Sequence, residues 1–125
     1  MLQSLAIAGG GAIGALLRYW SVGAVHGVLG RDFPWGTLMV NVAGSLLMGI
    51  AWVWLVDRAL LGGEWRSLLM VGGLGAFTTF STFSIETLRL LEDGRLLLAL
   101  LNVMGSVLLC LLAVWGGALL ARQWL

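Results

Sequence analysis

Apolar residues dominate this chain in four long runs, which are separated by short polar stretches. The runs cover residues 2–26, 36–56, 67–91 and 96–121. A helix needs about 20 apolar residues to cross the hydrocarbon core of a bilayer, so each run is long enough to do so. The pattern predicts an all-α membrane protein with four transmembrane helices, folded as a single domain over residues 1–125.

The composition strengthens this prediction. Hydrophobic residues make up 60% of the chain and charged residues only 10%, whereas a soluble domain carries about 25% charged residues. So few charges cannot cover a water-facing surface, and we expect the outside of the bundle to face lipid. The first run lacks the basic start and short apolar core of a cleavable signal, so we expect it to remain as a span. No constellation typical of an enzyme is visible, and we expect no enzymatic activity.

The arginines indicate how the chain is oriented in the membrane. Four spans put both termini and the 57–66 connection on one side, and orientation follows the arginine and lysine content of short loops. Each side carries three arginines: Arg58, Arg66 and Arg122 on one, Arg31, Arg89 and Arg95 on the other. A chain balanced in this way is expected to insert in both orientations, which permits an antiparallel dimer.

Polar and small residues inside the first span form one stripe. Gly10, Gly14 and Arg18 are spaced i, i+4, i+8, which places them on the same helical face. The two glycines make a GxxxG pair, a signature of close helix packing in membranes. Arg18 is therefore expected to face protein or water. Its spacing leaves two roles open: holding an anion near a vestibule, or reaching the lipid headgroups.

A second polar stripe runs along the second span through Thr37, Asn41 and Ser45. The hydroxyls can bond their own helix backbone and are weak indicators. The Asn41 amide has two donor hydrogens and an acceptor oxygen to satisfy. Either it bonds another helix, or its NH₂ group faces a permeant species. In the fourth span Asn102 and Ser106 repeat the i, i+4 arrangement.

The third span is the least regular. Three glycines, Gly72, Gly73 and Gly75, precede a segment over residues 78–84 that holds five hydroxyl side chains. Glycine and β-branched residues weaken a helix, and Ser and Thr compete for its backbone bonds. We expect a break near mid-membrane, where irregular backbone must be buried in protein or line a wet cavity. Freed carbonyls at such a break can coordinate a cation. The alternative is a continuous helix with self-satisfied hydroxyls.

Three motifs lie along the spans: Gly10-x-x-x-Gly14-Ala15-x-x-Arg18-Tyr19, Gly36-Thr37-Leu38-x-Val40-Asn41-x-x-Gly44 and Gly75-x-Phe77-Thr78-Thr79-Phe80-Ser81-Thr82-Phe83. Together they resemble the CrcB/Fluc fluoride channels, and the Thr-Thr-Phe-Ser-Thr-Phe block is the most specific part. The resemblance covers all four spans. It implies a passive fluoride-selective channel in the bacterial inner membrane that exports fluoride from the cytoplasm. It further implies an antiparallel, dual-topology homodimer with two pores and a structural sodium ion at the central interface.

The resemblance also implies roles for single residues. Asn41 matches the pore asparagine, and Phe80 and Phe83 match the phenylalanines that flank the fluoride path. Gly75 and Thr78 match positions whose backbone carbonyls hold the sodium ion. The other matched positions are Thr37, Ser81, Thr82 and Glu86 in the polar track, Ser106 in the fourth-helix part of the pore and Arg18 at the pore entrance. Family members often have tyrosine where this chain has Asn102, so the phenol has no counterpart here.

The chemistry of fluoride is consistent with these positions. Fluoride is small and strongly hydrated, so a pore must replace its water with donors and still release it. The Asn41 amide and the Ser81 and Thr82 hydroxyls are donors. The edge of an aromatic ring is the positive part of its quadrupole, so Phe80 and Phe83 can meet an anion edge-on. At spacing i, i+3 the two rings share a face of a regular helix; the alternative is that they serve different pores.

Two other functions compete with the channel. A small multidrug-type, proton-coupled exporter is also a short four-helix, dual-topology dimer, but it relies on an acidic residue in its first helix. The first span here holds Arg18 and no acidic residue. A non-transporting membrane scaffold would use the small residues for assembly alone, which leaves the clustered donors of the third span unexplained.

Overall fold

The computed structural model describes residues 1–124, and their regular structure is helical. The first long helix is α1 (Leu2–Leu29), and the second is α2 (Trp35–Trp52), which continues as the π-helical turn η1 (Val53–Asp57). The third run is divided into four pieces, α3 (Gly63–Arg66), η2 (Ser67–Leu74), α4 (Gly75–Phe77) and α5 (Phe80–Glu92). The last helix is α6 (Leu96–Gln123).

Four helical stretches are long and apolar enough to cross a membrane, namely Leu2–Leu29, Trp35–Asp57, Gly63–Glu92 and Leu96–Gln123. This confirms the predicted all-helical architecture of four spans. The connection predicted at residues 57–66 is shorter than expected, because η1 continues to Asp57 and α3 already begins at Gly63. Charged residues at a helix end do not interrupt the helix, since their side chains point into solvent.

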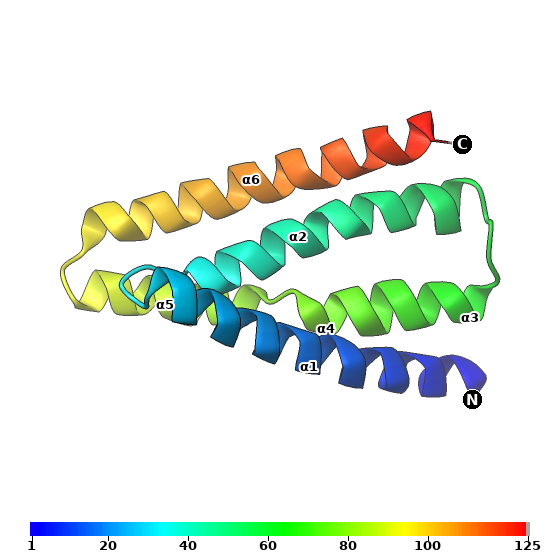
Figure 1. The fold of residues 1–125 in the computed structure, drawn as a ribbon, viewed down its shortest axis with the longest axis horizontal. Coiled ribbons are helices and arrows are strands. Elements are labelled where there is room, and N and C mark those ends of the chain that lie inside the picture. The colour runs from blue at the N-terminus through cyan, green and yellow to red at the C-terminus, as the bar shows by residue number, and fades with distance from the viewer. Residues whose placement is uncertain (125) are drawn as a thin grey trace.

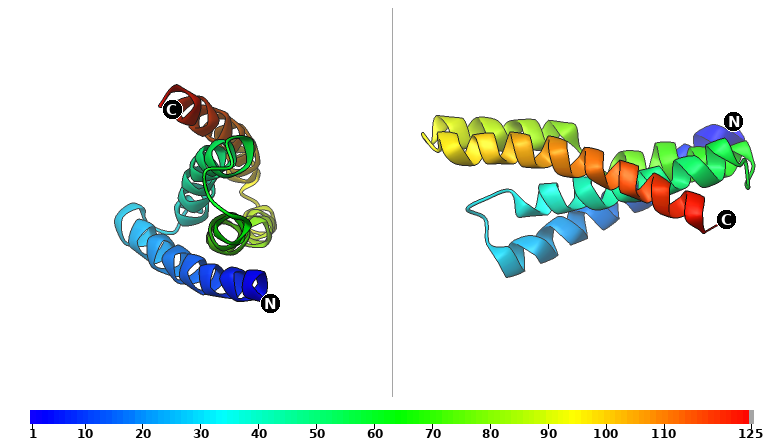
Figure 2. Two further views of the ribbon diagram at one scale, coloured as in Figure 1. Left: turned by 90° about the vertical axis from the view of Figure 1, so that its right-hand side faces the viewer. Right: turned by 90° about the horizontal axis from the view of Figure 1, so that it is seen from above.

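The helices lie lengthwise beside one another, with both termini and the 58–62 connection at one end (Figure 1). Viewed along its length, the molecule has α1 at one edge and α6 at the other, with α2 and the third run between them (Figure 2). The closest helix pairs are α2 with α6 and α1 with η2. The predicted placement of both termini and the middle connection on one side is thus confirmed within residues 1–124.

Glycines allow these two helix pairs to approach closely. Gly10 and Gly14 of α1 are buried against η2, where an added Cβ would collide with backbone oxygens. Gly49 of α2 and Gly117 of α6 face each other's helix in the same way. In lipid, helices associate through such close packing, because burying apolar side chains gives no advantage there. The GxxxG pair in the first span therefore has the packing role that its spacing predicted.

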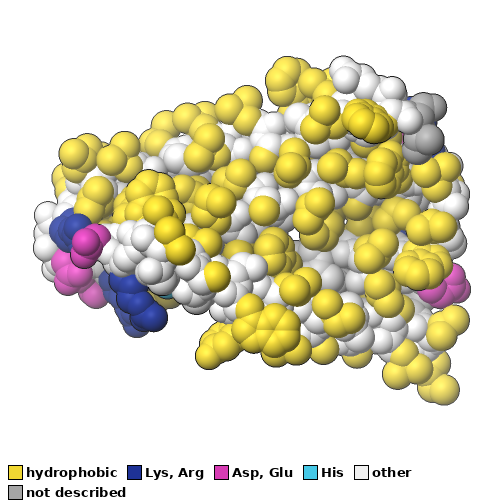
Figure 3. Space-filling model, in the orientation of Figure 1, with side chains coloured by type: hydrophobic (Ala, Val, Ile, Leu, Met, Phe, Trp, Pro, Cys, Tyr) yellow, Lys and Arg dark blue, Asp and Glu magenta, His cyan; other side chains and the backbone are white. Residues whose placement is uncertain are grey.

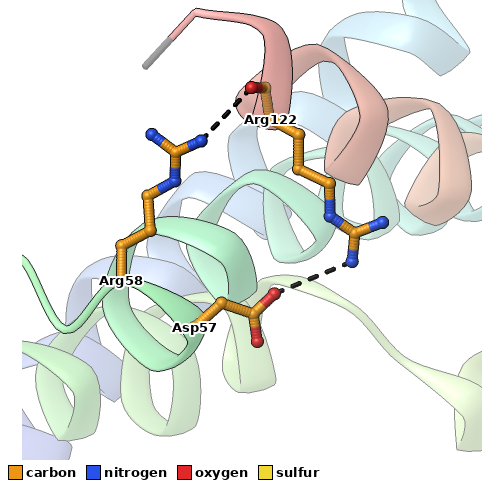
Figure 4. A network of polar contacts seen from close by, with 3 residues as sticks. All are labelled: Asp57, Arg58 and Arg122. Carbon is orange, nitrogen blue, oxygen red and sulfur yellow. Dashed lines mark hydrogen bonds and ion pairs between the residues drawn. The ribbon is translucent and has the colours of Figure 1, made fainter.

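The surface separates charged from apolar residues along the length of the molecule. Hydrophobic side chains cover the middle, and charged side chains gather toward the two ends (Figure 3). At the end that holds the termini, Arg122 Nη2 lies 3.7 Å from Asp57 Oδ2, and Arg58 Nη2 donates to the Arg122 carbonyl at 3.2 Å (Figure 4). These groups are largely exposed, so we expect this contact to contribute little to stability.

Candidate functional site

The third run is interrupted between α4 and α5. Thr78 has φ −88° and ψ 159°, and Thr79 has φ −154° and ψ 121°, so both residues are extended. The interruption is visible between α4 and α5 in Figure 1. The predicted break is confirmed, but it is narrower than the hydroxyl-rich segment. Ser81, Thr82 and Ser84 belong to the regular helix α5, and Ser84 Oγ bonds the Phe80 carbonyl of its own helix at 2.9 Å.

Asn41 of α2 holds the broken segment in place. Its Nδ2 donates to the Thr79 carbonyl at 2.9 Å, and its Oδ1 accepts from the Thr79 N–H at 2.8 Å. Of the two roles predicted for Asn41, bonding another helix is the one observed. One amide hydrogen is left over, and Asn41 also lines a cavity described below. Gly44 makes room for this contact, because a Cβ there would collide with the Thr78 methyl group.

Thr79 also begins the next helix. Its Oγ1 accepts from the Thr82 N–H at 3.2 Å, the hydrogen bond typical of a helix N-cap. The same oxygen lies 3.1 Å from Thr82 Oγ1 and 3.4 Å from Ser81 Oγ. A buried residue thus gathers three hydroxyls around the start of α5. We expect the cap to fix where α5 begins and hence which way Phe80 and Phe83 point.

The break removes the helical partners of the carbonyl groups just before it, those of Gly75 and Thr78 among them. In an α-helix the carbonyl of residue i accepts from the N–H of residue i+4. The partner of Gly75 would be the Thr79 N–H, which bonds Asn41, and the partner of Thr78 would be the Thr82 N–H, which bonds Thr79 Oγ1. The carbonyls of Gly75 and Thr78 therefore lose their helical donors. Freed carbonyl oxygens of this kind suit a hard cation.

A cavity of about 460 Å³ lies between α2, α5 and α6 on one side of the break. Its lining includes Asn41, Phe80, Phe83 and Ser106. The two phenylalanine rings have centroids 5.3 Å apart and planes inclined by 45°. They share a face of the regular helix α5, as their spacing predicted. Phe83 is 9% exposed and Phe80 77% exposed, so only Phe83 is packed inside the chain.

A second cavity, of about 810 Å³, lies between α1, α2 and the start of α5. Arg18, Thr37 and Thr82 line it, together with His26. The half-buried Arg18 thus faces a cavity among protein side chains, which agrees with the prediction that it avoids lipid. Thr79 lines both cavities, so the two lie on either side of the broken segment.

The residues of the predicted polar track lie in different surroundings. Thr37, whose hydroxyl was considered able to satisfy itself on its own backbone, instead donates to the Glu86 carboxylate across the α2–α5 interface. A strong charged acceptor within reach outcompetes the carbonyl of the same helix. Glu86 lines a third cavity of about 250 Å³ beside Arg89 and Arg31, outside the first two. Ser81 lines none of these three cavities and is exposed.

Sequence reasoning missed Cys110 in the first cavity and a polar contact of Thr87 with Asn102, the hydrogen-bond partner of Ser106. Cys110 lines it one turn beyond Ser106 and continues the stripe that begins at Asn102. Thr87 bonds Asn102 Nδ2 at 2.9 Å, and Asn102 Oδ1 in turn accepts from Ser106 Oγ at 3.4 Å. The i, i+4 spacing of Asn102, Ser106 and Cys110 was available as a signal. The contact between Thr87 and Asn102 was not, because it depends on how α5 packs against α6.

Comparison with known proteins agrees with this architecture. The family model described as "CrcB-like protein, Camphor Resistance (CrcB)" matches residues 5–118. The chain belongs to this family. Curated relatives named "Fluoride-specific ion channel FluC" include proteins from Methylococcus capsulatus, Magnetococcus marinus and Geobacter sulfurreducens. They are 58%, 51% and 50% identical to this chain over 98%, 97% and 98% of its length. The chain spans about half (54%) of the Methylococcus protein but 98% and 99% of the other two.

Proposed function

We propose that this chain is a fluoride-specific ion channel that lets fluoride leave the cytoplasm passively. The observation that carries the proposal is the broken third span, where backbone, amide and hydroxyl groups gather between two cavities. The identity of the ion comes from the curated relatives named as fluoride-specific channels. The bacterial sources of these relatives and the four membrane-length helices support a location in the bacterial inner membrane. The names of the relatives support a channel, not an enzyme.

The proposed path begins in the second cavity. There the Arg18 guanidinium attracts an anion, and the Thr82 hydroxyl replaces part of its water. The ion then passes the segment held by Asn41 and enters the first cavity. Thr37 and Glu86 are bonded to each other beside this path, so we assign them a role in holding α2 to α5. Ser81 is assigned to the outer edge of the hydroxyl cluster at the start of α5, because its Oγ lies 3.4 Å from Thr79 Oγ1 and its side chain is exposed.

Phe80, Phe83 and Ser106 guide the ion through the first cavity. The planes of the two rings are inclined by 45° and are therefore not stacked in parallel, which leaves positive ring edges to meet an anion. Ring edges attract fluoride weakly, and Ser106 adds a hydroxyl. A pore must bind an ion well enough to admit it and weakly enough to release it. A few weak donors spread along a path meet that requirement better than one strong site.

A second copy of the chain completes the proposed channel as an antiparallel dimer with two pores. The large exposure of Phe80 supports this assembly, because a pore phenylalanine needs cover from another surface. The balanced arginines permit it, since neither orientation is favoured. The freed carbonyls of Gly75 and Thr78 would hold a sodium ion at the central interface. A bound cation neutralises the negative ends of carbonyl dipoles and thereby braces the two copies.

No energy source is required for export. Fluoride enters a cell as neutral HF and dissociates in the less acidic cytoplasm. An inside-negative membrane potential then favours exit of the anion by about 2.3 kcal/mol per 100 mV. A selective passive pore is therefore sufficient to lower cytoplasmic fluoride.

Ion efflux from liposomes tests the proposal directly. Purified protein is reconstituted into liposomes loaded with fluoride or chloride, and efflux is started with a potassium ionophore. We expect fluoride to leave at least about a hundredfold faster than chloride, without ATP or a proton gradient, because selectivity of about 2.7 kcal/mol is within the range of a few lost donor contacts. Equal chloride efflux, or proton-coupled uptake of a cationic drug, would contradict the proposal. Protein-free liposomes are the control.

A further inference from the structure

A buried polar chain links α6 to α5 beside the first cavity. Asn102 is 2% exposed and is among the most buried polar side chains described. Its Nδ2 donates to Thr87 Oγ1 at 2.9 Å, and Ser106 Oγ lies 3.4 Å from its Oδ1. Within residues 1–124 the Asn102–Thr87 bond is the only side-chain hydrogen bond that joins α5 and α6. The proposed ion path uses Ser106 but gives Asn102 no role.

The hydrogen bonds that link Ser106, Asn102 and Thr87 all run in one direction. A threonine hydroxyl has a single proton, and that of Thr87 is donated to the Phe83 carbonyl at 2.7 Å. Thr87 can therefore only accept from Asn102, which fixes the NH₂ group toward Thr87 and the amide oxygen toward Ser106. Since an amide oxygen only accepts, Ser106 must donate to it. The donors point from Ser106 through Asn102 and Thr87 toward α5.

This direction matters because Ser106 lines the first cavity. While its proton is directed at Asn102, Ser106 offers only lone pairs to the cavity, and these repel an anion. Fluoride must draw the proton away from the Asn102 oxygen before Ser106 can donate to it. The distance of 3.4 Å is long for a hydroxyl donor, whose bonds usually measure about 2.7–2.8 Å. Asn102 is thus a weak competitor for the proton.

We propose that Asn102 is a positioning residue that sets how strongly Ser106 donates to the permeating anion. The proposal rests on the proposed fluoride channel. When an ion arrives, the Ser106 hydroxyl turns from Asn102 to the ion, and it returns to Asn102 when the ion leaves. Each exchange replaces one hydrogen bond by another, so the ion gains a donor without being held tightly. Such a balance is what a conducting site needs.

The test measures fluoride efflux at a series of fluoride concentrations. Replacing Asn102 by leucine removes the competitor, so Ser106 should hold fluoride more firmly. We expect Asn102→Leu to lower the half-saturating fluoride concentration at least threefold and to slow efflux at high fluoride. A purely structural role would reduce the amount of folded, active protein and leave the half-saturating concentration unchanged. In a Ser106→Ala background the leucine substitution should cause no further shift, because coupled residues are not additive.

Thr87→Val is a second substitution that should free the Ser106 proton. Without the Thr87 oxygen, the Asn102 amide can rotate and present its NH₂ to Ser106, which frees the Ser106 proton for the cavity. This variant should lower the half-saturating concentration in the same direction as Asn102→Leu, even if the latter fails to fold. Ser84→Ala is the matched control, because it also removes an α5 hydroxyl bonded to its own helix, outside the three cavities described above.

The outcomes separate this role from the channel itself. If the wild type conducts fluoride but Thr87→Val leaves its half-saturating concentration unchanged, the positioning role is wrong and the channel stands. A shift by Asn102→Leu of equal size with and without Ser106 would also overturn the role, since Asn102 would then act by another route. If the wild type conducts no fluoride, the proposed channel fails, and the role of Asn102 fails with it.

Discussion

Asn41 supplies two hydrogen bonds to the extended backbone of Thr79, one to its carbonyl and one from its N–H. These groups would otherwise remain unpaired in a segment that has left the helix, and Thr79 is 8% exposed. An unpaired buried polar group costs about 1–3 kcal/mol. The break in the third span therefore depends on an asparagine that lies 38 residues earlier in the chain.

Replacing Asn41 by leucine should abolish most fluoride efflux and lower stability. The leucine has a similar volume but leaves both Thr79 groups unpaired, so we expect a loss of about 2–4 kcal/mol in unfolding free energy. Fluoride efflux from liposomes should fall at least tenfold. Thermal unfolding in detergent and efflux from the same preparation measure the two effects.

Asn41→Asp tests the effect of a negative charge at this position separately from the loss of the hydrogen bonds to Thr79. Aspartate keeps the oxygen that accepts from the Thr79 N–H, but it places a second oxygen against the Thr79 carbonyl and adds a negative charge beside the path. We expect a larger loss of efflux than for leucine, because the charge also repels fluoride. An efflux rate for Asn41→Asp equal to that of the wild type would remove Asn41 from the path.

Among the helices, close contact between α1 and η2 depends on glycine. Gly14→Ala would drive a methyl group into the Gly73 backbone, so α1 must move away from η2. Overpacking of this kind costs about 1–3 kcal/mol of unfolding free energy. We therefore expect a lower thermal unfolding midpoint in detergent. Gly9→Ala on the same helix is the control, because its Cβ meets nothing within 4 Å. Equal effects of both substitutions would contradict a packing role for Gly14.

The helices could be predicted from the sequence to different extents. The four spans could be predicted because lipid requires long apolar runs, and those runs are read directly from the residues. The break could be predicted from glycine and threonine content, but its restriction to Thr78 and Thr79 could not. That restriction depends on Asn41 reaching from α2 and on Thr79 capping α5. The π-helical turns η1 and η2 were likewise not predicted, since they depend on packing between helices.

In the candidate site, too, features set by spacing within one helix could be predicted, and features set by contacts between helices could not. Phe80 and Phe83 share a face because i, i+3 spacing acts within one helix. Thr37 bonds Glu86 and not its own backbone because α2 and α5 bring the two together, which no local pattern indicates. Arg18 was expected to avoid lipid, and it lines a cavity between helices. Roles that depend on a second copy of the chain remain predictions of the proposed channel.

For the whole molecule, the decisive property is that its two ends carry equal numbers of arginines. Both ends carry charge (Figure 3). In the sequence, the six arginines other than Arg18 are divided three against three. Since orientation follows the excess of arginine and lysine in short connections, two added arginines at one end should fix how the chain inserts. A proposed antiparallel dimer needs both orientations. Fixing one of them should therefore remove the active assembly without changing any residue of the pore.

Two pairs of substitutions test this requirement. Leu60→Arg with Leu61→Arg adds charge at the end that holds the termini, and Leu29→Arg with Leu96→Arg adds it at the other; all four leucines are exposed. Each variant expressed alone should lose at least about tenfold in fluoride efflux, because most chains would face the same way. Expressed together, the two variants should recover efflux, since each supplies the orientation that the other lacks. Glutamine at Leu60 and Leu61 controls for polarity without charge. Full efflux from either arginine variant alone would show that both orientations are not required, and the antiparallel assembly would have to be abandoned.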